Sequence, residues 1–274
     1  MTQFINIDGQ LTSSERPVAT AANRSLRYGD GLFESMHWKS GKLPLGDFHF
    51  QRLFEGMKAL RLESPSTFTA EYLHHQIDLL CAQNKLDSAR IRLNLFREDG
   101  GLLAPRHNRA RFIIETAALT RISDEPLRLT VYREQKKANG LLANLKTNSH
   151  LLYILAAQYA NAEGFDDALI LNTADRFCEA TSSNVFFIRD SRLYTPSLEE
   201  GCVAGVMRRH LLAQLPGMGF SVSEIPVDKE LLMTMDEMFL TNAVRGIRMV
   251  GSFSGKSFST SIGPKLAKAF NLLF

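Results

Sequence analysis

The sequence predicts an α/β or α+β protein of two domains, and three observations lead there. Runs that alternate like half-buried strands are interleaved with runs of helical period along the whole chain of 274 residues. Hydrophobic residues make up 45% and charged residues 22%, which is ordinary for a folded protein with a substantial core. The stretch 120–126 is polar, lacks periodicity and ends in proline, as linkers do. We therefore expect one domain over residues 1–120 and a second over 121–274.

The composition argues against several classes of function. The formal net charge is +3, from 32 basic and 29 acidic residues without a basic stripe, so no nucleic-acid partner is implied. No apolar run is long enough to span a bilayer, and residues 1–10 do not resemble a signal peptide. Cys81, Cys178 and Cys202 are widely spaced and lack CxxC or His-rich partners, which argues against disulfides and a metal site. We expect a cytoplasmic protein that binds no membrane and no metal.

In the first domain the pattern predicts helices beside strands. Asp47 is expected to cap a helix whose apolar side chains recur every three or four residues. Arg52 flanks that apolar face, where a guanidinium suits a phosphate or a carboxylate; the alternative is a surface arginine paired with Glu55. Residues 28–31, with two glycines around an aspartate, either close over a ligand or form a plain tight turn. The expected ranges are strands at 4–7, 91–95 and 111–119, and helices at 47–60 and 69–86.

The second domain is richer in strands. Asp190 and Ser191 are expected to form the turn of a hairpin, and a buried strand from Met238 to Arg248 is expected to end in polar residues and two arginines. The remaining expected ranges are strands at 127–131, 167–172, 184–189 and 192–195, and helices at 151–160 and 210–215.

Lys146 stands just before the helix expected at 151–160. The run Thr147-Asn148-Ser149 offers side-chain oxygens of the kind that cap a helix, which would put Lys146 beside the positive end of that helix. An ammonium is disfavoured there, so the neutral, nucleophilic amine is favoured. An ordinary solvated lysine is the alternative, because short motifs of this kind occur often by chance.

Three further patterns carry chemistry. Glu179 is placed in a turn before the buried strand 184–189, where its carboxylate needs a partner such as loop amides or a ligand's ring nitrogen. The small residues 201–205 lead into a helix and leave free amides that suit an anion, while Asn242 lies at the end of a buried strand. An amine, an acid, free amides and an arginine together suit a phosphorylated aromatic aldehyde.

Taken in order, these segments resemble one family over nearly the whole chain. The chain is similar to the class IV, fold-type IV pyridoxal-phosphate enzymes, which include branched-chain and D-amino-acid aminotransferases and aminodeoxychorismate lyases. The resemblance implies an N-terminal α/β domain, a C-terminal barrel-like domain, pyridoxal 5'-phosphate as cofactor, and a homodimer. It is carried by residues 28–34, His49 to Leu53, Lys146, Glu179 to Phe187, 205–208 and 241–243.

The same resemblance implies a role for each residue. Lys146 would bind the cofactor covalently and later move a proton, and Glu179 would keep the ring nitrogen protonated. The phosphate would be bound by the side chains of Arg52 and Asn242 and by the backbone amides of Val206 and Met207.

Within the family, the choice is between elimination and transamination. Asn242 resembles the lyases, whereas branched-chain aminotransferases usually have threonine there, so we expect a 4-amino-4-deoxychorismate lyase of folate biosynthesis that releases 4-aminobenzoate and pyruvate. A branched-chain or D-amino-acid aminotransferase is the first alternative, and a non-catalytic protein that binds pyridoxal phosphate is the second. The substrate would be a small anionic amine. Four arginines are candidates for binding its carboxylates: Arg97, Arg106, Arg245 and Arg248. Each could equally be an ordinary surface arginine, and the last two are favoured because they follow Asn242.

Overall fold

The computed structural model describes residues 3–119 and 123–271, which form two compact units. The first unit contains the described residues up to 119 together with the short segment Leu145–Ser149. The second contains the residues from 123 to Asn144 and from His150 onward. The boundary expected between residues 120 and 121 lies outside the described residues. The inclusion of Leu145–Ser149 in the first unit was not predicted, because nothing local to the segment indicates it.

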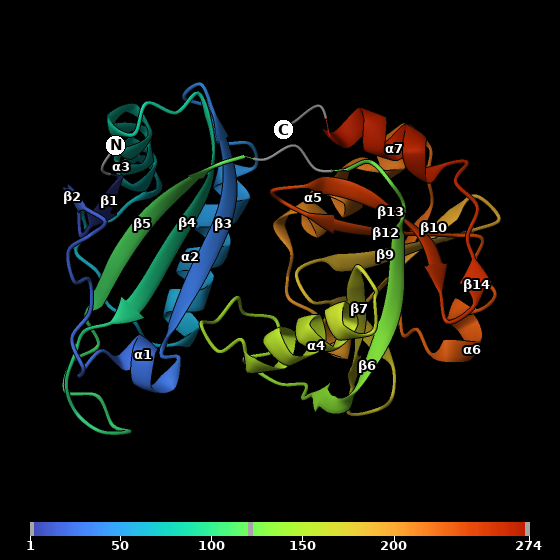
Figure 1. Ribbon diagram of the computed structural model, residues 1–274, viewed down its shortest axis with the longest axis horizontal. Coiled ribbons are helices and arrows are strands. Elements are labelled where there is room, and N and C mark those ends of the chain that lie inside the picture. The colour runs from blue at the N-terminus through green and yellow to red at the C-terminus, as the bar shows by residue number, and fades with distance from the viewer. Residues whose placement is uncertain (1–2, 120–122, 272–274) are drawn as a thin grey trace. The chain divides into compact units, whose positions relative to one another are not determined.

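The first unit is a five-stranded antiparallel sheet in the order β2-β1-β5-β4-β3, with the helices α2 and α3 on one of its faces (Figure 1). Apolar side chains of β3, β4 and both helices form its core. Gly56 of α2 lets the helix approach β3 closely, since a Cβ there would lie 2.8 Å from a methyl group of Leu32. The elements are β1 Phe4–Ile7, β2 Gln10–Ser13, α1 Arg24–Tyr28, β3 Gly31–Lys39, α2 Gly46–Ala59, α3 Ala70–Gln83, β4 Ser88–Arg97 and β5 Ala110–Ala118.

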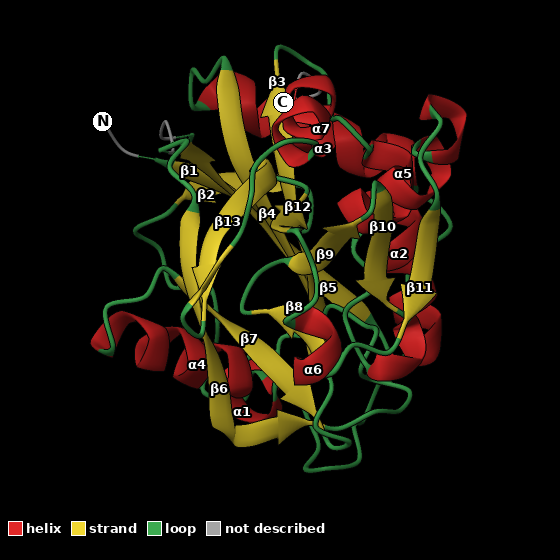
Figure 2. Ribbon diagram, turned by 90° about the vertical axis from the view of Figure 1, so that its right-hand side faces the viewer, coloured by secondary structure: helices red, strands yellow, loops and turns green. Residues whose placement is uncertain are grey.

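The second unit is built on a mixed nine-stranded sheet in the order β11-β10-β9-β12-β13-β6-β7-β8, with β14 beside β13. Strand β8 also lies near β9 and β10, so the sheet curls back on itself. Helix α4 packs along β6 and β7 (Figure 2). The elements are β6 Leu127–Lys137, α4 Leu151–Ala162, β7 Asp167–Asn172, β8 Phe177–Ala180, β9 Asn184–Arg189, β10 Arg192–Pro196, α5 Val206–Gln214, β11 Val222–Ile225, α6 Lys229–Leu232, β12 Glu237–Asn242, β13 Gly246–Phe253, β14 Lys256–Ser257 and α7 Gly263–Phe270, with short 3₁₀ turns at Leu198–Glu200 and Pro216–Met218.

Several expectations about local structure are wrong, each for a physical reason. Helix α2 is preceded by Leu45 without a side-chain cap, so Asp47 lies inside its first turn rather than capping it. Residues 147–149 do not cap α4, whose N-cap is His150, because their backbone pairs with β3 instead. Glu179 lies within strand β8 rather than in a turn. The strand expected from 238 to 248 is the hairpin of β12 and β13, with Arg245 in its turn.

The mixed α/β architecture and the strands at 4–7, 167–172 and 184–189 are confirmed. Among the described residues, no helix is both long and apolar enough to cross a membrane. The three cysteines are buried as free thiols.

Candidate active site

Lys146 lies beside the edge strand β3 in the first unit. The backbone amide of Phe33 donates to the carbonyl of Lys146 at 2.9 Å, and the amide of Asn148 donates to the carbonyl of Gly31 at 2.9 Å. These two bonds make the segment a short antiparallel neighbour of β3. The ammonium nitrogen of Lys146 lies 4.3 Å from the centre of the Phe33 ring. Lys146 is therefore held by backbone pairing with β3, and does not stand beside a helix cap as the sequence suggested.

A buried cluster of Glu34, His49 and Arg52 lies on the helix side of the same strand. Arg52 donates to both oxygens of Glu34, at 2.8 Å from Nε and 2.5 Å from Nη2, and Nδ1 of His49 lies 2.7 Å from Oε2. Burial alone would raise the pKa of Glu34, but the charge of Arg52 and the hydrogen bonds from Arg52 and His49 outweigh it and lower this pKa to about 2. Glu34 therefore orients Arg52, and Glu55, the alternative partner, accepts a hydrogen bond from Gln51.

His49 adds a neutral member to this cluster. It is fully buried, and burial lowers its pKa more strongly than Glu34 raises it. The neutral ring donates from Nδ1 to the Glu34 carboxylate, and its buried Nε2 has no hydrogen-bond partner. Glu34 and His49 were not predicted as supports of Arg52, although a carboxylate on the face of β3 that also carries the core residues Leu32 and Met36 is an informative signal.

Glu179 is the centre of a polar group in the second unit. Its Oε1 accepts from Nζ of Lys137 at 2.5 Å and from the hydroxyl of Tyr153 at 2.8 Å, while its Oε2 accepts from the amide of Val203 at 2.9 Å. Only 3% of Glu179 and 8% of Lys137 is exposed. The predicted need of Glu179 for partners is met by three donors that the sequence analysis did not name.

The start of helix α5 lies next to this group and fits a phosphate. No side chain caps α5, so the amides of Val206 and Met207 stand at a helix N-terminus where anions bind favourably. Glycine at position 205 lets the side chain of Asn184 lie close to the start of α5, because a Cβ on residue 205 would lie 1.8 Å from Oδ1 of Asn184. Asn184 in turn donates to the carbonyl of Val203 at 2.9 Å. The donors present suit the phosphate of the expected cofactor.

Asn242 and Thr241 end strand β12 near these residues. The amide of Asn242 donates to Ser183 Oγ at 3.0 Å, and its Oδ1 accepts from the amides of Val244 and Arg245 at 3.0 and 2.8 Å, so this side chain shapes the loops. Thr241 pairs with Asn184 across the strands, which places their side chains on one face of the sheet. The buried hydroxyl of Thr241 has no partner in the described structure, so it is available to donate to a ligand, and the sequence did not predict it.

The four candidate arginines have different surroundings. Arg97 is buried and donates to Asp30, Asn108 and the carbonyl of Leu60 at 3.0, 2.7 and 2.8 Å, so it binds the protein itself and is not retained as a substrate ligand. Arg106 lies on an exposed loop of the first unit. In the second unit, burial and then the nearby charge of Arg245 lower the pKa of Arg248. An anion beside both would relieve that repulsion.

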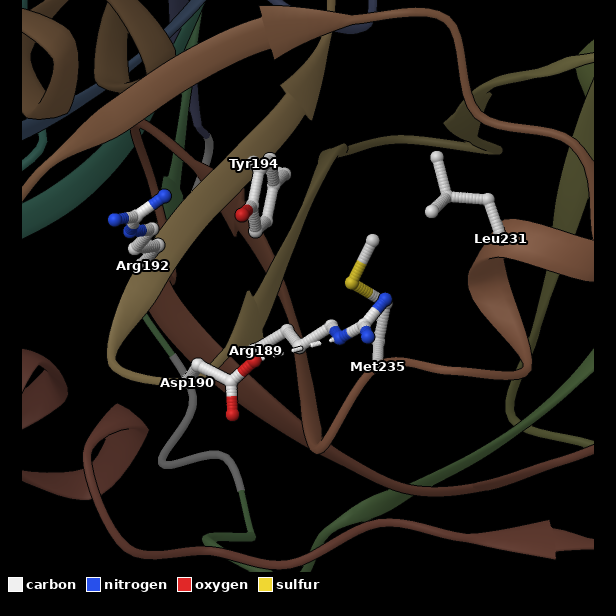
Figure 3. Close-up of a pocket in the computed structure, with 6 residues that line it drawn as sticks. All are labelled: Arg189, Asp190, Arg192, Tyr194, Leu231 and Met235. Carbon is white, nitrogen blue, oxygen red and sulfur yellow. Dashed lines mark ion pairs between the residues drawn. The ribbon is translucent and has the colours of Figure 1, made fainter.

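A separate pocket of about 430 Å³ lies at the hairpin of β9 and β10 (Figure 3). Arg189 and Asp190 form an ion pair at 3.6 Å on its rim. None of the predicted site residues is among those that line it, which are Arg189, Asp190, Arg192, Tyr194, Leu231 and Met235.

Comparison with known proteins identifies the family. The model of the amino-transferase class IV family matches residues 31–253, which is most of the chain. The chain belongs to this family. The predicted resemblance is thereby confirmed, and membership makes the protein a pyridoxal-phosphate-dependent enzyme, either a lyase or an aminotransferase.

Individual relatives include both activities. An aminodeoxychorismate lyase from Vibrio harveyi is 28% identical over 85% of this chain and 86% of its own length. The crystal structure of 4-amino-4-deoxychorismate lyase from Pseudomonas aeruginosa has a TM-score of 0.85 at 28% identity and covers 97% of both chains. A branched-chain aminotransferase from Thermoproteus uzoniensis, solved with norvaline, has a TM-score of 0.91 at 25% identity and covers 98% of this chain and 93% of its own. The two-domain fold of the class is confirmed.

Proposed function

We propose that this class IV enzyme is a 4-amino-4-deoxychorismate lyase, which releases 4-aminobenzoate and pyruvate. The observation that carries the proposal is the pair of contacts made by the Asn242 side chain. Its amide donates to Ser183, and its carbonyl oxygen accepts from the amides of Val244 and Arg245, so it connects two loops. A threonine lacks the amide group that makes this bridge. Lyases at 28% identity, by sequence and by structure, support the same choice.

The residues of the chain have distinct tasks in this reaction. Lys146 would bind the cofactor covalently. Once the amine of the substrate has displaced it, the amine of Lys146 would take the proton from the amine-bearing carbon of the substrate. Glu179 would hold the ring nitrogen in its protonated form through the remaining acceptor position of Oε2. When bound, pyridoxal phosphate supplies a ring that accepts electrons from the substrate carbon.

Each unit, taken by itself, offers groups that suit a phosphate. In the second unit, the amides of Val206 and Met207 and the hydroxyl of Thr241 would donate to the phosphate. Asn242, expected among these donors, uses its side-chain amide on Ser183 instead. In the first unit, Arg52 is oriented by Glu34 for a bidentate contact with an anion. Arg245 and Arg248 would bind the substrate's carboxylates, with Arg106 as a weaker candidate because of its exposure.

Transamination is the second candidate, and the structural match to the Thermoproteus uzoniensis aminotransferase favours it. The two reactions are separated by one assay. Purified protein is given 4-amino-4-deoxychorismate without a 2-oxo acid, and pyruvate is followed with lactate dehydrogenase. The lyase releases pyruvate with no amino acceptor, and Lys146→Ala abolishes that release. Turnover that occurs only after a 2-oxo acid is added would establish an aminotransferase in place of a lyase.

We also propose that the protein is a homodimer. Large apolar side chains are exposed on α4 and the loop before it, at Leu141, Leu142, Leu151, Ile154 and Leu155. Such a group marks a surface for association. Sedimentation velocity should show a dimer that Leu151→Glu dissociates, whereas Leu26→Glu on α1, where the residue is equally exposed at 73%, should leave it intact.

A further inference from the structure

Lys137 is a buried lysine that the proposed reaction does not use. It is the last residue of β6, and the register of β6 against β7 shifts between Tyr132 and Lys137, which sets this residue apart from the regular ladder. Its Nζ lies 2.5 Å from Oε1 of Glu179 and donates to the carbonyl of Ala143 at 2.9 Å. A buried ammonium needs a compensating anion and hydrogen-bond acceptors, and Lys137 has both.

The other groups near this ion pair are neutral, so the positive charge that balances Glu179 comes from Lys137. Tyr153 from α4 donates to Glu179, and the charge of Glu179 acts on the nearby thiols of Cys178 in β8 and Cys202 ahead of α5. Burial raises the pKa of each of them, that of Cys202 to about 12, so all three are neutral at physiological pH. Without Lys137, the carboxylate would be a buried anion with only neutral donors.

We propose that Lys137 is a positioning residue that balances the charge of Glu179 and holds its carboxylate in place for the cofactor's ring nitrogen, and that ties this carboxylate to the loop that precedes Lys146 in the chain. The tie is the bond from Lys137 to the carbonyl of Ala143, which lies three residues before Lys146. Lys137 and Tyr153 both occupy Oε1, and Val203 takes one position on Oε2, so the second position on Oε2 is left for a ring N–H. The inference rests on the proposed role of Glu179.

The charge of Lys137 supports the contact that Glu179 would make with the ring. An anionic Glu179 accepts from a protonated ring nitrogen, which strengthens the electron-accepting character of the ring. Loss of Lys137 should therefore change both the affinity for the cofactor and the pH dependence of its bound spectrum.

The test compares Lys137→Met with Lys137→Arg, which keeps the charge. Each protein is prepared without cofactor and titrated with pyridoxal 5'-phosphate, and the visible band is followed from pH 6 to 9. Lys137→Met should weaken binding by about tenfold or more and shift the pH midpoint of the band, while Lys137→Arg should stay within roughly threefold of wild type. Lys136→Met is the matched control, because that neighbouring lysine pairs with Asp175 on the surface.

Glu179→Gln separates this inference from the role on which it rests. Glu179→Gln alone should weaken cofactor binding, and adding Lys137→Met to it should cause little further loss, because the charge to be balanced is already gone. If Glu179→Gln has no effect, the proposed role of Glu179 fails. If Glu179→Gln weakens binding while folded Lys137→Met keeps wild-type affinity and spectrum, the inference about Lys137 is wrong. Lys137→Gln serves where the methionine variant does not fold, and the same two outcomes decide.

Discussion

The buried carboxylate of Glu34 gives a prediction whose size follows from the structure. Arg52 and His49 lower the pKa of Glu34 from 4.5 to about 2, despite its burial. At about 1.4 kcal/mol for each pKa unit, the ionised form contributes about 3 kcal/mol to folding. Because the folded pKa is the lower one, this contribution is present above about pH 4.5 and is lost as the pH falls toward 2. The lowered pKa of buried His49 acts in the same direction at low pH, since unfolding lets the ring take up a proton.

The perturbation is Glu34→Gln, which removes the charge and keeps the shape. Urea unfolding of the wild type and the variant is measured from pH 7 to pH 3. The wild type should be about 3 kcal/mol more stable at pH 7, and the difference should shrink steadily below pH 4.5. Glu55→Gln on the same helix is the control and should change stability little, because Glu55 is exposed and accepts from Gln51 at the surface. A difference between wild type and Glu34→Gln that stays constant down to pH 3 would refute the reasoning.

Three further predictions concern the start of helix α5, where the phosphate would bind, the buried Arg97, and the three thiols. Gly205→Ala should weaken binding of pyridoxal phosphate by about tenfold in an absorbance titration, because the new Cβ would clash with Asn184. Gly217→Ala is the control and should bind the cofactor normally, because a Cβ at position 217 has open space around it. Arg97→Met should lower the free energy of unfolding by about 3 kcal/mol and leave KM unchanged, and a raised KM in stable protein would return Arg97 to the substrate site. A thiol reagent should label Cys81, Cys178 and Cys202 slowly until the protein is denatured, because they are buried and burial raises their pKa; rapid labelling of the native protein would contradict this.

Local periodicity was sufficient where a strand or helix buries one continuous face. Strands β7 and β9 were predicted with their observed limits, because their apolar runs are bounded by polar turn residues. The hairpin of β12 and β13 was missed, since one apolar pattern runs through its tight turn. The pairing of residues 147–149 with β3 was missed for another reason: it joins segments more than a hundred residues apart, and the local sequence suggests a helix cap instead.

The partners of the site residues were harder to predict than the residues themselves. Lys146 and Glu179 were singled out by residue type and order, but their surroundings depend on tertiary contacts. Lys137 looks like an ordinary charged residue after Lys136, and its burial follows from the irregular end of β6. Arg97 looked available to a substrate until its guanidinium was seen to bind Asp30, Asn108 and a backbone carbonyl.

The attachment of the cofactor to Lys146 can be measured directly. Purified protein is loaded with pyridoxal 5'-phosphate, reduced with borohydride and digested, and the labelled peptide is identified by mass spectrometry. We expect the label on Lys146 and none on the buried Lys137, whose ammonium is paired with Glu179. A label on another lysine, or reduction that leaves Lys146 unmodified in protein exposed to excess cofactor, would contradict it.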